Sequence, residues 1–358
     1  MTICDMKISE TKLTRKKFFL PFIIVLVLCS CSNKRDAQQL PKYDAYLFAY
    51  FEGSAGSRKN QEQLRFAVSD DAINWKALNN NEPIINSDDI SQSGGIRDPH
   101  ILRGEEPKEF YIVATDMSTA TNGWKENPGI VMLKSEDLIS WQHGKVNLAE
   151  AYPEKFENAY WVWAPQTIYD PVAEKYLVYF TVKFRDDDKL DFYCAYANKD
   201  FKGFENEPQF MFRAKYGAID GDIIYKDSTY HLFFKGNIKD EEGNEIQNGI
   251  KQAVSKSLQG PWDEQTDFID AYKDKRTGVE GSSIFKLNNS DTYILMYDLY
   301  SSGRYEFQRS TDLYHFTEKP ESFTKDFHPR HGSVISITRE EAKRLNNKWG
   351  GVTDVLID

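Results

Sequence analysis

Short apolar or alternating stretches recur along the chain, separated by polar turns. Five of them are rich in aromatic and β-branched residues, a composition typical of β-strands. Helical periodicity is visible only near Glu340–Leu345, where a terminal helical turn is expected. The pattern therefore predicts an all-β protein. The five stretches are Tyr46–Phe51, Phe110–Ala114, Tyr176–Thr181, Tyr230–Phe234 and Tyr293–Tyr297.

A turn phrase of the form Ser-x-Asp-x-x-x-aromatic accompanies these strands. It occurs as Ser69–Trp75, Ser135–Trp141 and Ser310–Phe316, with looser copies at Asn198–Phe204 and Ser255–Trp262. Its aromatic residue recurs at the outer turns of different units, which indicates a packing role rather than ligand binding.

A third element completes each unit and begins at positions 98, 164, 220, 280 and 331. Repetition at this spacing, with short strands and turn residues, predicts a radial array of sheets, and five units make a five-bladed β-propeller. A pair of β-sandwiches would not explain five copies in one register. Because Tyr43–Phe51 precedes the first unit and residues 331–335 follow the last, the closing blade should combine both chain ends. The propeller is expected to span residues 44–350.

The N-terminus has the pattern of a secretory signal. Four basic residues between Lys12 and Lys17 precede an apolar run from Phe18 to Cys29, which is too short to span a bilayer. The segment 28–31 resembles a bacterial lipobox, so residues 1–30 are predicted to be a lipoprotein signal peptide, Cys31 the lipidated residue and residues 31–43 a tether. An uncleaved anchor or a plain signal are the alternatives. The expected location is the bacterial cell envelope, at the periplasmic face or the cell surface.

Charge and cysteine content narrow the expected partners. The formal net charge is −10, and it becomes more negative once the basic signal is removed. Such a surface argues against nucleic acid or anionic lipid as a partner, leaving the lipid anchor as the membrane contact. Cys194 is the one cysteine beyond Cys31, so neither a disulfide nor a cysteine metal site is expected within the propeller. We expect a monomer.

The first residues of the five repeated elements suggest shared chemistry. They are Asp98, Ala164, Asp220, Glu280 and His331, each four residues before an apolar residue. A turn role is the simpler interpretation of any one acid. Three carboxyls and an imidazole in register are costly to bury without a use. Glycosidic hydrolysis needs two carboxyl groups in opposite protonation states, and a third carboxylate would help to keep the acid protonated.

The phrases that carry these residues resemble those of glycoside hydrolase family 43, from about Tyr46 to Ile337. They are Arg97–Ile101, Trp163–Gln166, Ile219–Asp222 and Val279–Ser282. The resemblance implies an inverting glycosidase in which Asp98 is the general base, Asp220 the pKa modulator and orienter, and Glu280 the general acid. Inversion implies a separation of roughly 6.5–9.5 Å between base and acid. His331 matches the family's channel histidine, which is associated with a central water or a structural calcium ion; no cofactor is otherwise required.

Two departures from the family's usual phrases bear on the site. Gly221 and Ser282 stand where prolines are common, although both are small enough to keep the backbone path. Asp222 adds a second carboxyl on the face expected for Asp220 and leaves open which one is the modulator; the register of the repeat favours Asp220.

Candidate sugar-binding residues flank the acids. Trp161 and Trp163 are expected to wall the sugar pocket or to pack between blades, and Arg304 to face the channel or to be an exposed loop charge. Strand alternation points Arg97 away from Asp98, towards a salt bridge or a ligand. The loops expected to rim the cleft are Gly53–Asn60, Thr119–Asn127 and Asn237–Gln247.

The sequence leaves several functions open. An exo-acting α-L-arabinofuranosidase acting on a polysaccharide or oligosaccharide is the leading expectation, with a β-xylosidase or a galactofuranosidase or galactanase of the same family as alternatives. A retaining fructan or sucrose hydrolase would need an early Asn-Asp-Pro nucleophile and an acid followed by Cys, and the sequence has neither. A glycan-binding propeller without catalysis would be expected to lose one of the three carboxyls.

Overall fold

The structure is a computed structural model that describes residues 41–351, apart from residues 55, 107, 266 and 273–276. The predicted signal peptide, Cys31 and nearly all of the predicted tether lie outside the described residues. In the part that is described, no helix has the length and apolar character needed to cross a bilayer.

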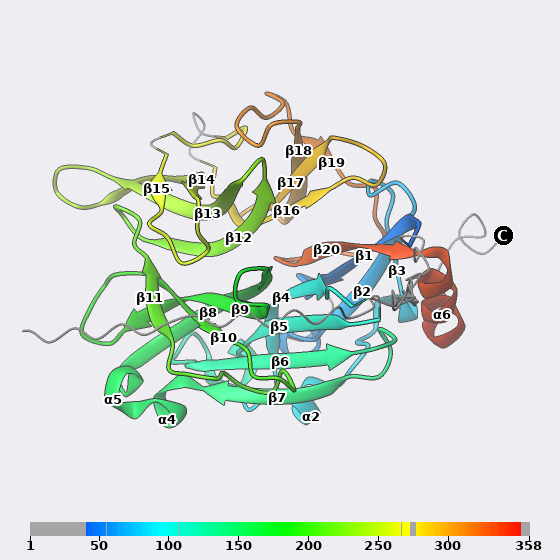
Figure 1. Ribbon diagram of the computed structural model, residues 1–358, viewed down its shortest axis with the longest axis horizontal. Coiled ribbons are helices and arrows are strands. Elements are labelled where there is room, and N and C mark those ends of the chain that lie inside the picture. Colours follow the sequence, from blue (N-terminus) through cyan, green and yellow to red (C-terminus); the bar gives the residue numbers. More distant parts are fainter. Residues whose placement is uncertain (1–40, 55, 107, 266, 273–276, 352–358) are drawn as a thin grey trace, which may run out of the picture. The chain divides into compact units, whose positions relative to one another are not determined.

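The described strands form five four-stranded antiparallel sheets arranged as the blades of a ring (Figure 1), which confirms the predicted five-bladed β-propeller. From its innermost strand outward, the first blade contains β20 (Ser333–Thr338), β1 (Tyr43–Tyr50), β2 (Arg65–Ser69) and β3 (Lys76–Ala77); the second contains β4 (Ile96–Arg103), β5 (Phe110–Asp116), β6 (Gly129–Ser135) and β7 (Gln142–Asn147). In the same order, the third contains β8 (Ala159–Asp170), β9 (Lys175–Phe184), β10 (Asp191–Tyr196) and β11 (Gln209–Phe212); the fourth contains β12 (Ala218–Lys226), β13 (Thr229–Lys239), β14 (Glu245–Ser255) and β15 (Asp263–Glu264). The fifth contains β16 (Glu280–Lys286), β17 (Tyr293–Leu299), β18 (Arg304–Ser310) and β19 (Glu321–Ser322).

The first blade is closed by both ends of the propeller, as the sequence predicts. Strand β20 pairs antiparallel with β1, with Ile335 opposite Leu47, and it occupies the innermost position. Because the last strand hydrogen-bonds to the first, the ring leaves no open sheet edge at the junction.

Helices in the described chain are short except at the C-terminal end. Helix α6 (Arg339–Trp349) begins with a capping box in which Thr338 and Glu341 satisfy each other's backbone N–H groups, and its Ala342 and Leu345 join the apolar core. The expected C-terminal helical turn is therefore a helix of three turns. The remaining helices are α1 (Arg58–Gln61), α2 (Ser87–Ile90), α3 (Thr119–Asn122), α4 (Leu148–Ala151), α5 (Pro153–Phe156) and the 3-10 turn Asn79–Asn81.

The repeated turn phrase has the same hydrogen bonds in three blades. In the second blade the carboxylate of Asp137 accepts the backbone N–H groups of Ile139 and Ser140 at 2.8 and 2.7 Å, and Asp71 and Asp312 make the equivalent bonds. The phrase therefore closes the turn between the two outer strands of a blade. Trp75 is buried against Phe48, in agreement with a packing role.

Candidate active site

The inner strand of each blade is interrupted by a β-bulge near its start. In the second blade Arg97 pairs with Thr115 and His100 with Val113, so two residues of β4 lie opposite one residue of β5. The same interruption occurs in β8, β12 and β16, and before β20, where the Arg330 N–H bonds to Phe51 and regular pairing resumes at Ser333. The bulged residue has positive φ in four blades: Asp98 (50°), Ala164 (44°), Asp220 (55°) and Gly281 (64°).

These bulges concentrate side chains on the axis of the propeller. A bulge breaks the in–out alternation of a strand, so two consecutive residues can face the same side. Both residues of the pairs Arg97–Asp98, Ile219–Asp220 and Arg330–His331 line one cavity of about 220 Å³. Arg97 thus lines the same cavity as Asp98 instead of pointing away from it, and the salt bridge expected for it is made with Glu62 at 3.0 Å. The other lining residues are Phe51, Met117, Trp124, Trp163, Lys235 and Glu280.

Glu280 occupies a different position in the repeat from the one that the sequence alignment gives it. The bulge of the fifth blade is at Gly281, so Glu280 is equivalent to Arg97 and not to Asp98. Gly281 is required because its φ is +64° and a Cβ atom there would lie 2.9 Å from the Cβ of His331. Glu280 nevertheless lines the same cavity as Asp98 and Asp220, since the bulge directs the preceding residue inward too.

Asp98 is held as an anion. Its Oδ2 accepts a hydrogen bond from the Thr115 hydroxyl at 2.9 Å, and its Oδ1 lies 3.5 Å from Nδ1 of His331. Burial alone would raise the pKa of Asp98, but the nearby His331, with Arg97 and the Thr115 hydroxyl, lowers that pKa overall. Asp98 is therefore suited to accept a proton.

Glu280, unlike Asp98, tends to keep its proton. Burial, followed by the charges of Asp220 and Asp298, raises the pKa of Glu280 to about 7, although Arg330 opposes the shift. An NH2 group of Arg330 donates to Oε1 of Glu280 at 3.1 Å, and Nε of Arg330 bonds to the buried Asp298. A carboxyl group with this pKa carries its proton over much of the range near neutrality, as a general acid requires.

Asp220 lies between these two groups. Its Oδ2 accepts the Gly281 N–H at 2.9 Å, and its Oδ1 is 3.7 Å from Nδ1 of His331. Burial raises the pKa of Asp220, and the negative charge of Asp220 in turn raises the pKa of Glu280. Because burial lowers the pKa of His331 less than Asp220 and Asp98 raise it, that pKa is about 9 and the imidazole is cationic at neutral pH.

Asp220 and Asp222 have different positions, since only Asp220 lines the axial cavity. Asp222 lies two residues further along β12, outside the lining of the cavity, where its Oδ2 accepts the Ile284 N–H at 2.8 Å. Its Oδ1 is 3.9 Å from Nε2 of the buried His100. Burial raises the pKa of Asp222 to about 7 and lowers the pKa of His100 to about 3, so this pair is largely uncharged near pH 6. Asp222 ties two blades together.

The predicted arginine is not one of the arginines that line the cavity. Arg304 is outside the cavity lining, half exposed, and pairs with Glu306 at 2.9 Å and with the Ser302 hydroxyl at 3.2 Å. The arginine that reaches the acid is Arg330. The repeat held a signal for it, because Arg330 precedes His331 as Arg97 precedes Asp98.

The two predicted tryptophans have different positions. Trp163 lines the cavity, and its indole N–H donates to Asn127 at 2.8 Å. Trp161 stacks on Trp163 with 4.1 Å between ring centres and supports it from outside the cavity. A third tryptophan that the sequence does not single out, Trp124, is 54% exposed and also lines the cavity. It lies in the predicted rim segment Thr119–Asn127.

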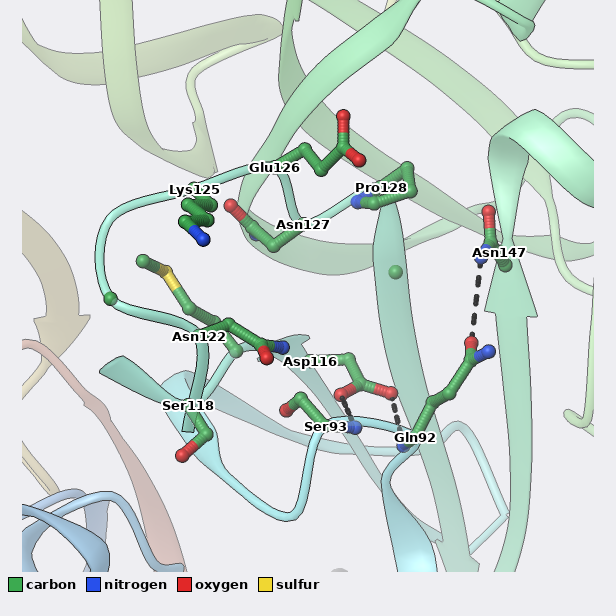
Figure 2. A pocket seen from close by; sticks show the side chains of 13 residues that line it. Gln92, Ser93, Asp116, Ser118, Asn122, Lys125, Glu126, Asn127, Pro128 and Asn147 are labelled. Atoms are coloured by element: carbon green, nitrogen blue, oxygen red, sulfur yellow. Dashed lines mark hydrogen bonds between the residues drawn. The ribbon is translucent and has the colours of Figure 1, made fainter. Parts of the chain in front are cut away.

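A separate cavity of about 200 Å³ lies beside this rim segment (Figure 2). Its polar atoms are mostly used within the protein. Asp116 accepts the backbone N–H groups of Gln92 and Ser93 at 2.6 and 2.9 Å, and the Asn147 amide bonds to Glu150. The carboxyl groups of Asp98, Asp220 and Glu280 do not line it; all three line the axial cavity.

The calcium ion predicted from the sequence would lie in the axial cavity, near His331. Among the described residues, no group of three or more His, Cys, Asp or Glu side chains is arranged to hold one. The His331 Nδ1 faces the carboxyl groups of Asp98 and Asp220, at 3.5 and 3.7 Å. The calcium ion near His331 stays a prediction. Cys194 is buried as a free thiol.

Comparison with known proteins agrees with this geometry. The profile of a family related to glycoside hydrolase family 43, described as a probable glycosyl hydrolase domain, matches residues 41–343. An α-L-arabinofuranosidase from Bifidobacterium longum subsp. longum is 27% identical over 253 residues, which cover 62% of this chain and 23% of that protein. The chain thus spans about a quarter of the length of that relative.

Solved structures share the fold at low identity. A family-43 β-1,3-galactosidase superposes with a TM-score of 0.56 at 15% identity, over 75% of this chain and 54% of that one. A thermostable family-43 glycoside hydrolase gives 0.55 at 12% identity, over 78% and 92% of the two chains. An α-L-arabinanase from Cellvibrio cellulosa, in complex with arabinohexaose, gives 0.51 at 14% identity, over 76% and 92%.

Proposed function

We propose that this chain, which belongs to the family of glycosyl hydrolase domains related to glycoside hydrolase family 43, is a glycosidase that hydrolyses its carbohydrate substrate with inversion and removes a terminal α-L-arabinofuranosyl unit. The catalytic part of this proposal rests on one observation: an ionised carboxyl group and a protonatable one line the same cavity. Asp98 has a lowered pKa, and burial among carboxylates raises that of Glu280 to about 7.

The proposed mechanism assigns each side chain one step. Asp98 takes a proton from a water molecule that attacks the anomeric carbon, while Glu280 gives its proton to the leaving oxygen on the opposite side of the sugar. The carboxylate of Asp220 keeps Glu280 protonated until that moment. His331 holds Asp98 ionised, and Arg330 positions Glu280. Trp163, backed by Trp161, provides an apolar wall for the sugar ring.

The choice of sugar rests on the relative from Bifidobacterium longum. That protein is an α-L-arabinofuranosidase, and its 27% identity extends over 253 residues. A β-galactosidic substrate is the second candidate, since a family-43 β-1,3-galactosidase shares the fold with a TM-score of 0.56. A glycan-binding propeller without catalysis is a weaker candidate because the three carboxyl groups meet on one cavity.

Two measurements test the proposal. A panel of nitrophenyl glycosides should show the highest kcat/KM for the α-L-arabinofuranoside. Proton NMR of the first product should then show the anomer opposite to that of the substrate. A first product that keeps the anomeric configuration would rule out the assignment of Asp98 as a general base for water.

We propose further that the mature protein is a monomeric lipoprotein of the cell envelope, attached through Cys31. The lipobox-like segment 28–31 supports the anchor. Labelled fatty acid should be incorporated into the wild-type chain and not into Cys31→Ala, and light scattering of the propeller without the anchor should give the mass of one chain.

A further inference from the structure

The axial cavity that the acids line, called the catalytic cavity below, adjoins a third cavity of about 400 Å³. We call this third cavity the arginine chamber. It shares Phe51, Arg97, Trp124 and Arg330 with the catalytic cavity. A substrate longer than one sugar can therefore continue from one cavity into the other. The rest of the chamber is lined by Glu52, Gly53, Arg58, Gln61, Glu62 and Thr119.

The carboxylates of the two glutamates in the chamber already accept hydrogen bonds from groups of the protein. Glu52 is 1% exposed and accepts four N–H donors, from Gly53, Ser54, the Asn81 side chain and His328. Glu62 is 2% exposed and accepts Arg97 at 3.0 Å and the backbone and hydroxyl groups of Thr119 at 2.8 and 2.5 Å. Since a carboxylate has about four acceptor positions, little capacity is left for a ligand.

One cation of the chamber, Arg58, is accessible to a ligand. Arg58 is exposed, and its NH1 group donates to the Thr119 hydroxyl at 3.3 Å. Within the described part of the chain it forms no ion pair, whereas Arg97 is paired with Glu62 and Arg330 with Glu280 and Asp298. A guanidinium group has five donors in a planar arrangement that matches a carboxylate. The chamber thus presents positive charge on a protein whose net charge is −10.

The chamber also offers an apolar face to a sugar ring. The Arg97 guanidinium lies between Phe51 and Trp124, 4.7 and 5.0 Å from their ring centres, and this contact orients the half-exposed indole of Trp124. Arg330, which touches the acid Glu280, lines the chamber as well. The chamber is therefore next to the group that protonates the leaving oxygen.

We propose that the arginine chamber binds a carboxylate-bearing sugar, a hexuronate, on the leaving-group side of the bond that is cleaved. The carboxylate pairs with Arg58, and the ring lies against Trp124. This inference rests on the proposed hydrolysis and names its substrate class: a terminal sugar attached to an acidic glycan.

The experiment uses two ligands that differ in one group. One is a disaccharide in which the terminal sugar found by the glycoside panel is attached to a hexuronate, and the other is its carboxyl-reduced counterpart. We expect kcat/KM of the wild type at low ionic strength to be at least roughly tenfold higher for the charged disaccharide, as for other charged hydrogen bonds. The preference should shrink in about 0.5 M salt, where exposed charges are screened.

Variants of Arg58 test whether this residue causes the preference for the charged disaccharide. Arg58→Gln should reduce the ratio of the two kcat/KM values to within about threefold, and Arg58→Lys should retain part of it, because a point charge replaces the planar donor pair. Arg304→Gln is the matched control: a half-exposed arginine outside both cavities, expected to keep the full ratio. Thermal unfolding of each variant shows whether it is folded.

A binding measurement separates this inference from the proposed hydrolysis. Calorimetry compares the affinity of the uronic-acid product sugar with that of its carboxyl-reduced counterpart. Tighter binding of the charged sugar that Arg58→Gln abolishes supports the chamber even if no glycoside is turned over. Equal kcat/KM and equal binding for charged and reduced ligands would overturn the inference while leaving the hydrolase assignment intact. An unchanged preference in Arg58→Gln would overturn it as well.

Discussion

The guanidinium group of Arg330 touches the carboxyl group of Glu280, with 3.1 Å between NH2 and Oε1, while its Nε bonds to the buried carboxylate of Asp298. This contact opposes the burial and the negative neighbours that raise the pKa of Glu280 to about 7. The protonation of Glu280 is therefore a balance between one cation and several acids, and that balance can be changed by mutation.

Removing the Arg330 charge should shift the alkaline limb of the pH profile. In Arg330→Gln the pKa of Glu280 rises because the opposing cation is lost, so Glu280 keeps its proton to higher pH. The fall of kcat/KM with rising pH should then begin at a higher pH than in the wild type. An alkaline limb that stays in place, or that moves down, would separate Arg330 from the acid.

The acidic limb should depend on His331. The positively charged His331, 3.5 Å from the Asp98 carboxylate, helps to lower the pKa of Asp98, so His331→Gln should raise that pKa. As pH falls, the base would be protonated earlier, and kcat/KM should begin to drop at a higher pH. The alkaline limb should move upward too, because the positive charge of His331 favours the ionised forms of its neighbours. If only kcat/KM at the optimum fell and both limbs kept their positions, His331 would have a purely structural role.

The acid role of Glu280 can be tested with leaving groups of different basicity. Glu280→Gln should lower kcat by roughly 10²–10⁴-fold on a natural glycoside, whose leaving oxygen must be protonated. The loss should be much smaller with a nitrophenyl leaving group, which departs without a proton. Glu306→Gln removes another buried carboxyl group, outside the cavity, and serves as the control. An equal loss on both substrates would contradict the assignment.

Asp222 should make folding stability depend on pH. Its pKa is raised to about 7 in the folded state from an unperturbed value near 3.8, so between these values the folded state retains a proton that the unfolded state has lost. This group therefore lowers stability as pH rises through that window. Asp222→Asn cannot ionise, and the free energy of unfolding of the variant minus that of the wild type should be larger at pH 8 than at pH 4. Urea unfolding of both proteins at pH 4 and pH 8 measures this difference in unfolding free energy. The same difference at both pH values would contradict the raised pKa of Asp222.

The repeat made much of the fold predictable. The Ser-x-Asp phrase, the aromatic second strands and the five inner phrases located the blades, since each feature depends on local bonding such as that of Asp137. The ring closure followed from the order of strands alone. The three acids that the sequence singles out, Asp98, Asp220 and Glu280, line one cavity, and their catalytic roles stay predictions.

Other parts of the site could not be read from spacing. Glu280 was aligned one residue out of register, and Arg97 was assigned to the wrong face, because strand alternation does not reveal a bulge. Arg330 was overlooked in favour of Arg304, although its position before His331 held the signal. Trp124 belongs to a rim loop without a repeat, so only the folded chain shows that it reaches the cavity.

By itself, the sequence determined that five similar units close into a ring and that three acids lie near the start of inner strands, since period, turn chemistry and hydrophobic alternation are local properties. The tertiary structure decided which neighbours surround each acid. The contact of His331 with Asp98 and that of Arg330 with Glu280 each join two different blades. The free energy of ionising each acid depends on such distances across the axis and on burial, and no single segment of the sequence encodes them.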